Sequence, residues 1–354
     1  MANQPTRDLR FEQIRILATI FVVGVHCLFL LQPDGTTSRQ FLINLLNCIF
    51  ACGNGLFFIM SGKFALAKSF DEDSLGDFYF KKILTLIFPL LLYMVLYSMI
   101  ETYTATNSLN GILKITINNI FSNYSCGYHF WFMYVLVGNI LLSPFLSKAI
   151  NGFQRKGLLI LAGLGIIHNM IYAYTPYFFG IGDAWSYPFA LWSAYFIIGG
   201  CIDKIITTSK ERKCIVIIGV LCVIIIMLKQ YFFSYKQFMF DLMPSYTFYV
   251  IMMYVVLQQI TIKNEKLKKI ILFLGKRTYG IYLVHFIVIR LFTPQIMPYL
   301  HFSGFPLLLF IIICVFLISF LSSYLIELII IRNIQKLCFF LQNKVREKSF
   351  ITSK

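Results

Sequence analysis

Ten long apolar segments recur along the 354 residues of the chain, and they restrict it to a narrow set of folds. A helix needs about 20 mostly apolar residues to cross the hydrocarbon core of a bilayer, so each segment is long enough to span one. The period-two alternation typical of membrane β-strands is absent from them. The segments cover about residues 14–31, 41–66, 83–100, 130–147, 157–175, 185–202, 214–233, 243–262, 278–297 and 305–331. We therefore predict an all-α polytopic membrane protein with about ten transmembrane helices.

The composition excludes two other classes of protein. Hydrophobic residues make up 58% of the chain and charged residues 13%, and the mean hydropathy is +0.76. A typical soluble domain carries about 25% charged residues, and disordered chains are poor in aromatic residues and rich in charge. The net charge of +16 resembles that of a nucleic-acid-binding protein. The basic residues lie between the apolar segments, however, so they indicate membrane orientation, and no nucleic-acid partner is expected.

The positions of the basic residues predict the orientation of the chain. With the N-terminus inside, 26 of the 31 lysines and arginines fall on the cytoplasmic side. A wrong number of spans would invert the later loops and remove this bias. We predict two cytoplasmic termini in the cell membrane, with short tails at about 1–13 and 332–354. The longest loop, 101–129, is expected outside, and no loop can hold a second domain, so residues 1–354 form one domain.

The nine cysteines do not form a recognisable framework. Most lie inside apolar segments, and they contain no CxxC pair or other metal-ligand spacing. We interpret them as small apolar residues, and we expect neither disulfides nor a bound metal.

Polar residues inside a membrane are costly, so each one is a functional candidate. Glu12, Arg15, Thr19 and His26 are spaced by three, four and seven residues, which places them on one helix stripe. Glu12 and Arg15 are expected to pair bidentately at the cytoplasmic edge. His26 lies about 16 Å further along the helix axis, where it is available as a base or nucleophile. The alternative is a histidine that only packs against a neighbouring helix.

The second segment carries a polar seam of Asn47, Asn54 and Ser61 at a spacing of seven residues. Gly53 and Gly55 in the same segment predict a close approach of a neighbouring helix.

Lys81 and Lys82 precede the third segment. Lysines at a membrane edge usually indicate orientation only. They are also the residues that a phosphate-bearing donor on the cytoplasmic face would need.

Further candidates begin the fourth and ninth segments. Trp131 is typical of the aromatic belt at a membrane interface, whereas His129 lies where an extracytoplasmic acceptor could reach it. Thr278, Tyr282 and His285 share a second helix stripe and predict a second buried histidine. His168 and His301 have no such polar neighbours, and we assign them no function.

Two kinds of protein suit buried histidines with a carboxylate–arginine pair. One is a membrane enzyme that moves an acyl group with histidine as base or transient acceptor. The other is a proton-coupled transporter or exporter, which uses such groups as a relay. Transporters often contain inverted repeats. The sequence shows no internal repeat, which favours the enzyme.

Four motifs in order resemble those of the membrane acyltransferase 3 family, over most of the chain. They are Glu12-x-x-Arg15 followed by His26, residues 57–62 (Phe-Phe-Ile-Met-Ser-Gly), residues 128–132 (Tyr-His-Phe-Trp-Phe) followed by Pro144, and residues 275–285 from Gly275 to His285. Glu12 stands where the family has aspartate, and Thr278 where it has serine. Lys82 matches the first position of an Arg-x-x-Arg motif, but Thr85 occupies the second.

The resemblance implies transfer of an acyl group, usually acetyl, from acetyl-CoA to a hydroxyl group. The acceptor hydroxyl would belong to a cell-surface polysaccharide or its lipid-linked precursor. Membrane lipid would surround the protein. His26 would be the catalytic histidine, supported by Glu12 and Arg15. We expect Lys81, Lys82 and Ser61 on the donor side. The substrate-binding residues on the acceptor side would be His129, Trp131, Tyr282 and His285.

Overall fold

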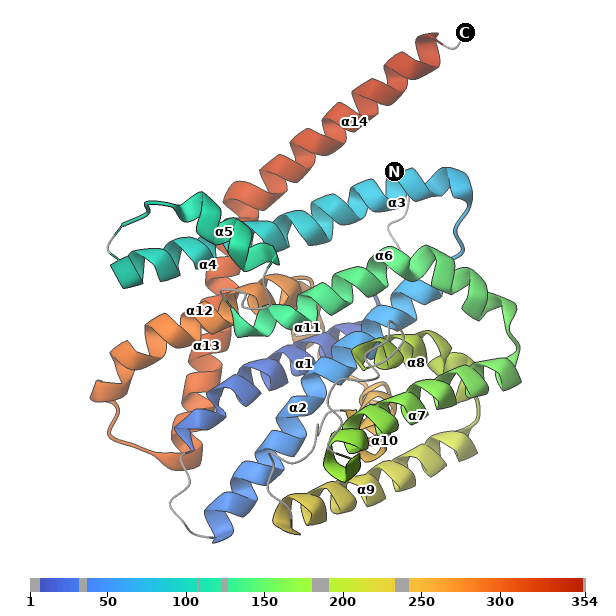
Figure 1. The fold of residues 1–354 in the computed structure, drawn as a ribbon, viewed down its shortest axis with the longest axis vertical. Coiled ribbons are helices and arrows are strands. Elements are labelled where there is room, and N and C mark those ends of the chain that lie inside the picture. Colours follow the sequence, from blue (N-terminus) through green and yellow to red (C-terminus); the bar gives the residue numbers. More distant parts are fainter. Residues whose placement is uncertain are drawn as a thin grey trace.

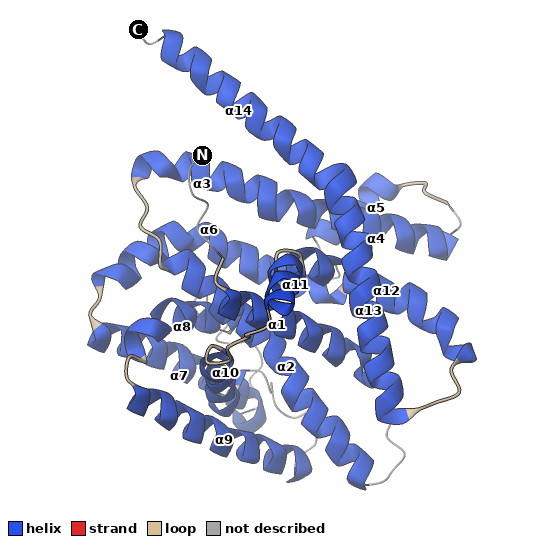
Figure 2. Ribbon diagram, turned by 180° about the vertical axis from the view of Figure 1, so that it is seen from behind, coloured by secondary structure: helices blue, strands red, loops and turns tan. Residues whose placement is uncertain are grey.

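A computed structural model describes residues 7–31, 37–106, 108–121, 127–179, 191–232 and 242–352. These residues form helices joined by turns, and no strand occurs among them (Figures 1 and 2). The α-helices are α1 (Leu9–Cys27), α2 (Thr37–Leu66), α3 (Leu75–Lys82), α4 (Phe88–Thr106), α5 (Ile112–Phe121), α6 (Trp131–Gly152), α7 (Arg155–Phe179), α8 (Trp192–Ile205), α9 (Ser209–Phe232), α10 (Pro244–Leu257), α11 (Glu265–Gly275), α12 (Thr278–Ile296), α13 (Gly304–Ile326) and α14 (Arg332–Thr352). The 3-10 turn η4 (Tyr128–Phe130) precedes α6, and two π-helical segments, η3 (Ile83–Ile87) and η8 (Glu327–Ile331), precede α4 and α14. The all-α prediction is confirmed.

Within the described residues, seven helices are long and apolar enough to cross a membrane. They cover Leu9–Leu30, Arg39–Leu66, Glu72–Thr106, Trp131–Gly152, Arg155–Thr175, Thr278–Tyr299 and Gly304–Val345. Helix α10 is a shorter apolar helix, and the predicted span 185–202 begins in residues outside the described part. A multi-pass membrane protein is confirmed, whereas the count of ten spans and the side on which each terminus lies stay predictions.

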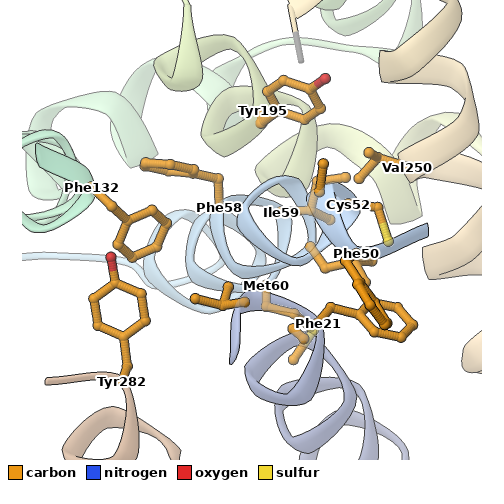
Figure 3. Close-up of a cluster of buried hydrophobic side chains, with 14 of the residues drawn as sticks. Phe21, Phe50, Cys52, Phe58, Ile59, Met60, Phe132, Tyr195, Val250 and Tyr282 are labelled. Atoms are coloured by element: carbon orange, nitrogen blue, oxygen red, sulfur yellow. The ribbon is translucent and has the colours of Figure 1, made fainter. Parts of the chain in front are cut away.

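Helix α2 forms the centre of the bundle and packs against α1, α6, α8 and α10. Figure 3 shows Phe58 of α2 beside Phe132 of α6, and Tyr282 of α12 close by. The ring centroids of Phe58 and Phe132 are 4.7 Å apart. Phe21 of α1 meets Phe50 of α2 at the other end of the same cluster, at 5.9 Å. These aromatic contacts fix the positions of α1, α6 and α12 around α2.

Glycines permit the closest helix contacts of α2. A Cβ atom at Gly53 would lie 2.7 Å from the carbonyl oxygen of Ala18 in α1, and one at Gly55 would lie 2.9 Å from Val250 in α10. The predicted close approach at these two glycines is therefore confirmed. At Gly62, a Cβ atom would collide with the backbone of Phe196, which makes the crossing with α8 equally dependent on glycine.

Side chains from two other helices bond to carbonyl groups of the π-helical segment η3. The π-helical pattern shifts backbone carbonyl groups away from their usual partners. Gln335 of α14 donates to the carbonyl of Leu84 at 2.8 Å, and the Tyr279 hydroxyl of α12 donates to that of Leu86 at 2.6 Å. These bonds tie α4 to α12 and α14.

Two regions have more helix than the sequence suggested. The tail 332–354 consists of α14 over its described residues, and this helix extends away from the bundle (Figure 1). The loop 101–129 contains the end of α4 and all of α5, which packs against α4.

The continuous stretch Glu72–Thr106 is about 52 Å long at 1.5 Å per residue, so it exceeds the ~30 Å hydrocarbon core.

Candidate active site

Helix α1 begins at a residue that caps it through its side chain. The Asp8 carboxylate accepts the backbone N–H of Arg10 at 2.9 Å and the Arg10 guanidinium at 2.6 Å. The guanidinium bond is the main reason that the pKa of the Asp8 carboxyl lies below its ordinary value. The cap fixes the start of α1 and therefore the register of the polar stripe that follows.

The Glu12 carboxylate is buried, at 2% exposure, and both of its oxygens have partners. Arg15 Nη1 donates to Oε1 at 2.5 Å, and Arg7 Nη1 lies 3.3 Å from each oxygen. The predicted pairing of Glu12 with Arg15 is confirmed. The expected bidentate geometry is wrong, because one guanidinium nitrogen makes the contact and Arg7 occupies the second oxygen.

The Glu12 carboxylate also lies against the chain that leads into α12. A Cβ atom at Gly275 would collide with this carboxylate, so only glycine leaves room for it. The Arg15 guanidinium lies over the Phe64 ring of α2, 5.0 Å from its centroid. The ion pair therefore lies where α1, α2 and the end of α11 meet.

Three imidazoles from separate segments meet further along α1: His26 of α1, His129 of η4 and His285 of α12. We call them the histidine cluster. The ring centroids of His26 and His285 are 5.3 Å apart, and those of His129 and His285 are 4.9 Å apart. Phe286 packs against His26 at 5.5 Å and against His129 at 5.3 Å. Helix α12 thus contributes two adjacent rings that bridge the other two histidines.

Burial differs among the three histidines. His285 is fully buried and His129 is 1% exposed, whereas His26 is partly exposed. The expectation that an external acceptor reaches His129 directly does not match this burial. Any ligand that approaches the histidine cluster in this conformation meets His26 first.

Backbone and hydroxyl groups hold the histidine cluster in place. The Tyr282 hydroxyl donates to the carbonyl of His129 at 2.7 Å, and the His285 Nδ1 atom lies 2.6 Å from the carbonyl of Tyr282. Thr278, Tyr282 and His285 are all buried, so the predicted stripe on α12 is confirmed.

Two ring nitrogens of the histidine cluster have no hydrogen-bond partner among the residues that the structure describes. They are Nδ1 of His129 and Nε2 of His285, both buried. A buried polar atom without a partner is unusual in a folded protein and needs an explanation. Neutral imidazoles with bare nitrogens in an aromatic surrounding can accept a proton or a hydrogen bond from a substrate.

Tyr97 of α4 belongs to this site, although no sequence pattern indicates it. Its hydroxyl lies 3.5 Å from His129 Nε2 and accepts the backbone N–H of Ile287 at 3.0 Å. The side chain is fully buried. Tyr97 stands in an apolar segment that contains other tyrosines, and only the tertiary structure distinguishes it from them.

The other predicted site residues lie in separate places. Trp131 is partly exposed and packs against Trp192 of α8, with centroids 5.2 Å apart. Lys82 lies over the Phe78 ring at 5.6 Å, and Lys81 is exposed. Neither lysine side chain makes an ion pair or hydrogen bond within the described residues, so both are free for an anionic ligand. Ser61 is partly exposed on α2.

The described residues hold no cluster of three or more His, Cys, Asp or Glu side chains in a metal-binding arrangement.

Comparison with known proteins adds a family assignment. A family model described as an acyltransferase domain matches residues 8–327. This range includes the Glu12–Arg15 pair, His26 and all of α12. Neither a curated protein nor a solved structure matches the chain.

Proposed function

The chain belongs to the membrane acyltransferase 3 family, and from this premise we propose that it transfers an acetyl group from acetyl-CoA to a hydroxyl of a cell-surface polysaccharide or of its lipid-linked precursor. The family establishes a membrane acyltransferase in general. The acetyl donor, the glycan acceptor and a location in the cell membrane are parts of the proposal.

The histidine cluster is the observation that supports the proposal most. Transfer from a thioester to a hydroxyl requires a base that takes the hydroxyl proton or a nucleophile that carries the acyl group for a time. His26 suits either role, because it is the partly exposed member of the cluster and makes no hydrogen bond to a described residue.

In the simpler route, His26 accepts the proton of the acceptor hydroxyl. The oxygen then attacks the thioester carbonyl carbon, the carbon–sulfur bond breaks, and the thiolate leaves and takes up the proton. In the alternative route the acetyl group is first bonded to a His26 nitrogen and then passes to the hydroxyl. Both routes give one ester and one thiol.

The donor would approach from the end of α1 that carries Glu12 and Arg15. Lys81 and Lys82, whose ammonium groups make no ion pair with a described residue, are suited to the phosphates of acetyl-CoA, with Ser61 on the same side. Thr85, which donates to the carbonyl of Lys81 at 2.7 Å, replaces a basic residue there. On the other side, Trp131 offers an aromatic surface for a sugar ring near His129 and Tyr282.

Mass spectrometry of the surface polysaccharide tests the proposal directly. Glycan from cells with the protein should carry an acetyl mass increment that is missing from cells without it. Cells with the His26→Gln variant should match the latter, and cells with His168→Gln should match the former. Equal acetylation in all four samples would contradict the proposal. Glycan export that depends on the protein without any acetyl product would favour a transporter.

A further inference from the structure

We propose that His285 is the proton acceptor of His26: Nε2 of His285 takes the proton that His26 releases from one nitrogen while its other nitrogen accepts the proton of the acceptor hydroxyl. This inference deepens the proposed acyl transfer and rests on it. His285 is a positioning residue in this reaction, because it acts through His26.

The tautomer of His285 follows from the hydrogen bond of its Nδ1 atom. Nδ1 lies 2.6 Å from the carbonyl oxygen of Tyr282, and a carbonyl oxygen can only accept. Nδ1 therefore carries the hydrogen. A neutral imidazole has one N–H group, so Nε2 holds a lone pair.

This lone pair is buried and unused within the described residues. Nε2 of His285 has no hydrogen-bond partner, and the side chain is fully buried on α12. A residue that served packing alone would gain by satisfying this atom or by being apolar. An acceptor that is held bare at a fixed position is instead ready to take a proton.

His26 is the neighbour best placed to supply that proton. Its ring centroid lies 5.3 Å from that of His285. Because each nitrogen lies about 1 Å from the centroid of its ring, a rotation of His26 brings one of its nitrogens within hydrogen-bond reach of Nε2 of His285. His129 also contacts His285, at 4.9 Å, but it is 1% exposed, whereas His26 is partly exposed and can meet a substrate.

The surroundings fix the orientation that this transfer needs. The Tyr282 carbonyl holds the His285 ring from one side, and the Tyr282 hydroxyl binds the carbonyl of His129 at 2.7 Å. Phe286 fills the space between His26 and His129. Hydrogen bonding of one ring nitrogen to an oxygen acceptor is the usual way in which a protein sets the tautomer of the other nitrogen.

The proton and electron balance is complete. The O–H bond of the acceptor breaks as an N–H bond forms on His26, and the opposite N–H bond of His26 breaks as one forms on Nε2 of His285. The acceptor oxygen bonds to the thioester carbon, and the carbon–sulfur electron pair leaves on sulfur. The proton then returns from His285 through His26 to the thiolate, and no oxidant or reductant is involved.

The first test uses the full-length protein in detergent with acetyl-CoA as the probe and thiol release as the signal. His285→Asn retains a donor near the Nδ1 position, so it can still bind the Tyr282 carbonyl, but it offers no base at Nε2. We expect kcat to fall by about 10²–10⁴-fold, the usual contribution of general base catalysis, with the KM for acetyl-CoA unchanged. His168→Asn is the matched control and should keep the wild-type rate.

The second test is chemical rescue of His285→Ala by added imidazoles of different basicity at constant pH. If His285 is a proton acceptor, the rescued rate should increase with the basicity of the added imidazole. Rescue that is independent of basicity, or His285→Asn at the wild-type rate, would overturn the inference.

A third measurement separates this inference from the proposed function. Nitrogen-15 NMR of labelled histidine, assigned by comparison with His285→Asn, should show His285 with its hydrogen on Nδ1. The opposite tautomer would refute the inference even if the wild-type protein consumes acetyl-CoA. A wild-type protein that never consumes acetyl-CoA would refute the proposed donor, and with it the role of His285.

Discussion

Helix α1 has two polar places, one against the end of α11 and one against α12, that differ in how fully their atoms are hydrogen-bonded. At the Glu12 end, both carboxylate oxygens have arginine partners, and Gly275 leaves just enough room for the carboxylate. At the histidine cluster, two buried ring nitrogens have no partner among the described residues. Buried polar groups that are fully bonded stabilise one arrangement, whereas unpaired ones are costly unless a ligand completes them.

The difference separates two roles along one helix stripe. The paired Glu12–Arg15 group is suited to hold α1, α2 and the end of α11 together. The histidine cluster, with two buried ring nitrogens that have no partner among the described residues, is suited to accept a proton or a hydrogen bond from a substrate. A variant at the paired place should therefore change stability first, and a variant at the unpaired place should change activity first.

The largest effect is expected for His26→Gln. Glutamine has similar size and hydrogen bonding but cannot take up a proton, so acetyl transfer should fall by at least about 10²–10⁴-fold. Loss of a covalent acyl carrier would cost more. The melting temperature in detergent should remain within a few degrees of wild type, since His26 makes no hydrogen bond to a described residue. A variant that is assembled and acetylates at the wild-type rate would exclude His26 as the catalytic residue.

Glu12→Gln should act on stability before activity. Loss of one partner of a buried ion pair typically costs about 3–5 kcal/mol, but Arg15 is 27% exposed and Arg7 46%, so about 1–2 kcal/mol is expected here. Thermal unfolding in detergent measures the change.

The double variant Glu12→Met/Arg15→Met is the control for this effect. Replacement of both charges by apolar side chains should recover part of the lost stability, because no unpaired buried charge remains. If Glu12→Gln leaves the melting temperature unchanged but abolishes transfer, the Glu12–Arg15 pair takes part in catalysis. The contrast between this pair and the histidine cluster would then be wrong.

Arg15→Lys should have a smaller effect than a bidentate contact would predict. One guanidinium nitrogen makes the bond to Glu12, and an ammonium group can replace a single donor and can still lie over the Phe64 ring. We expect a loss of a few-fold in transfer rate and a small fall in melting temperature. A loss as large as that of His26→Gln would indicate that the planar guanidinium itself binds the donor.

The sequence predicts features that depend on local spacing. The all-α class, the Glu12–Arg15 pair and the buried stripe through Thr278, Tyr282 and His285 follow from helical periodicity and apolar run length. Each of these needs only residues within one helix. The structure confirms all three.

Features that depend on tertiary contacts lie beyond such reasoning. His26, His129 and His285 are more than 100 residues apart in the chain, so their meeting requires the packing of α1, η4 and α12. Tyr97 has no distinguishing spacing. Helix α5 and the helical tail α14 were expected as loop and tail, because their polar residues obscure the apolar pattern of a span.

The smallest effect on activity is expected at His168 of α7, and it sharpens the comparison most. Both of its ring nitrogens are buried without a partner, as in the histidine cluster, but no ring contact or ion pair joins it to another described titratable side chain. If an unpaired nitrogen were sufficient for function, His168 would qualify. We argue that it is not sufficient, because proton transfer also requires a second group within reach.

His168→Leu should keep the wild-type rate of acetyl transfer. It should also raise the free energy of unfolding by about 1 kcal/mol, because it removes an unsatisfied buried polar group. A tenfold loss of transfer in this variant would place α7 in the functional site and would remove the distinction on which the histidine cluster was assigned.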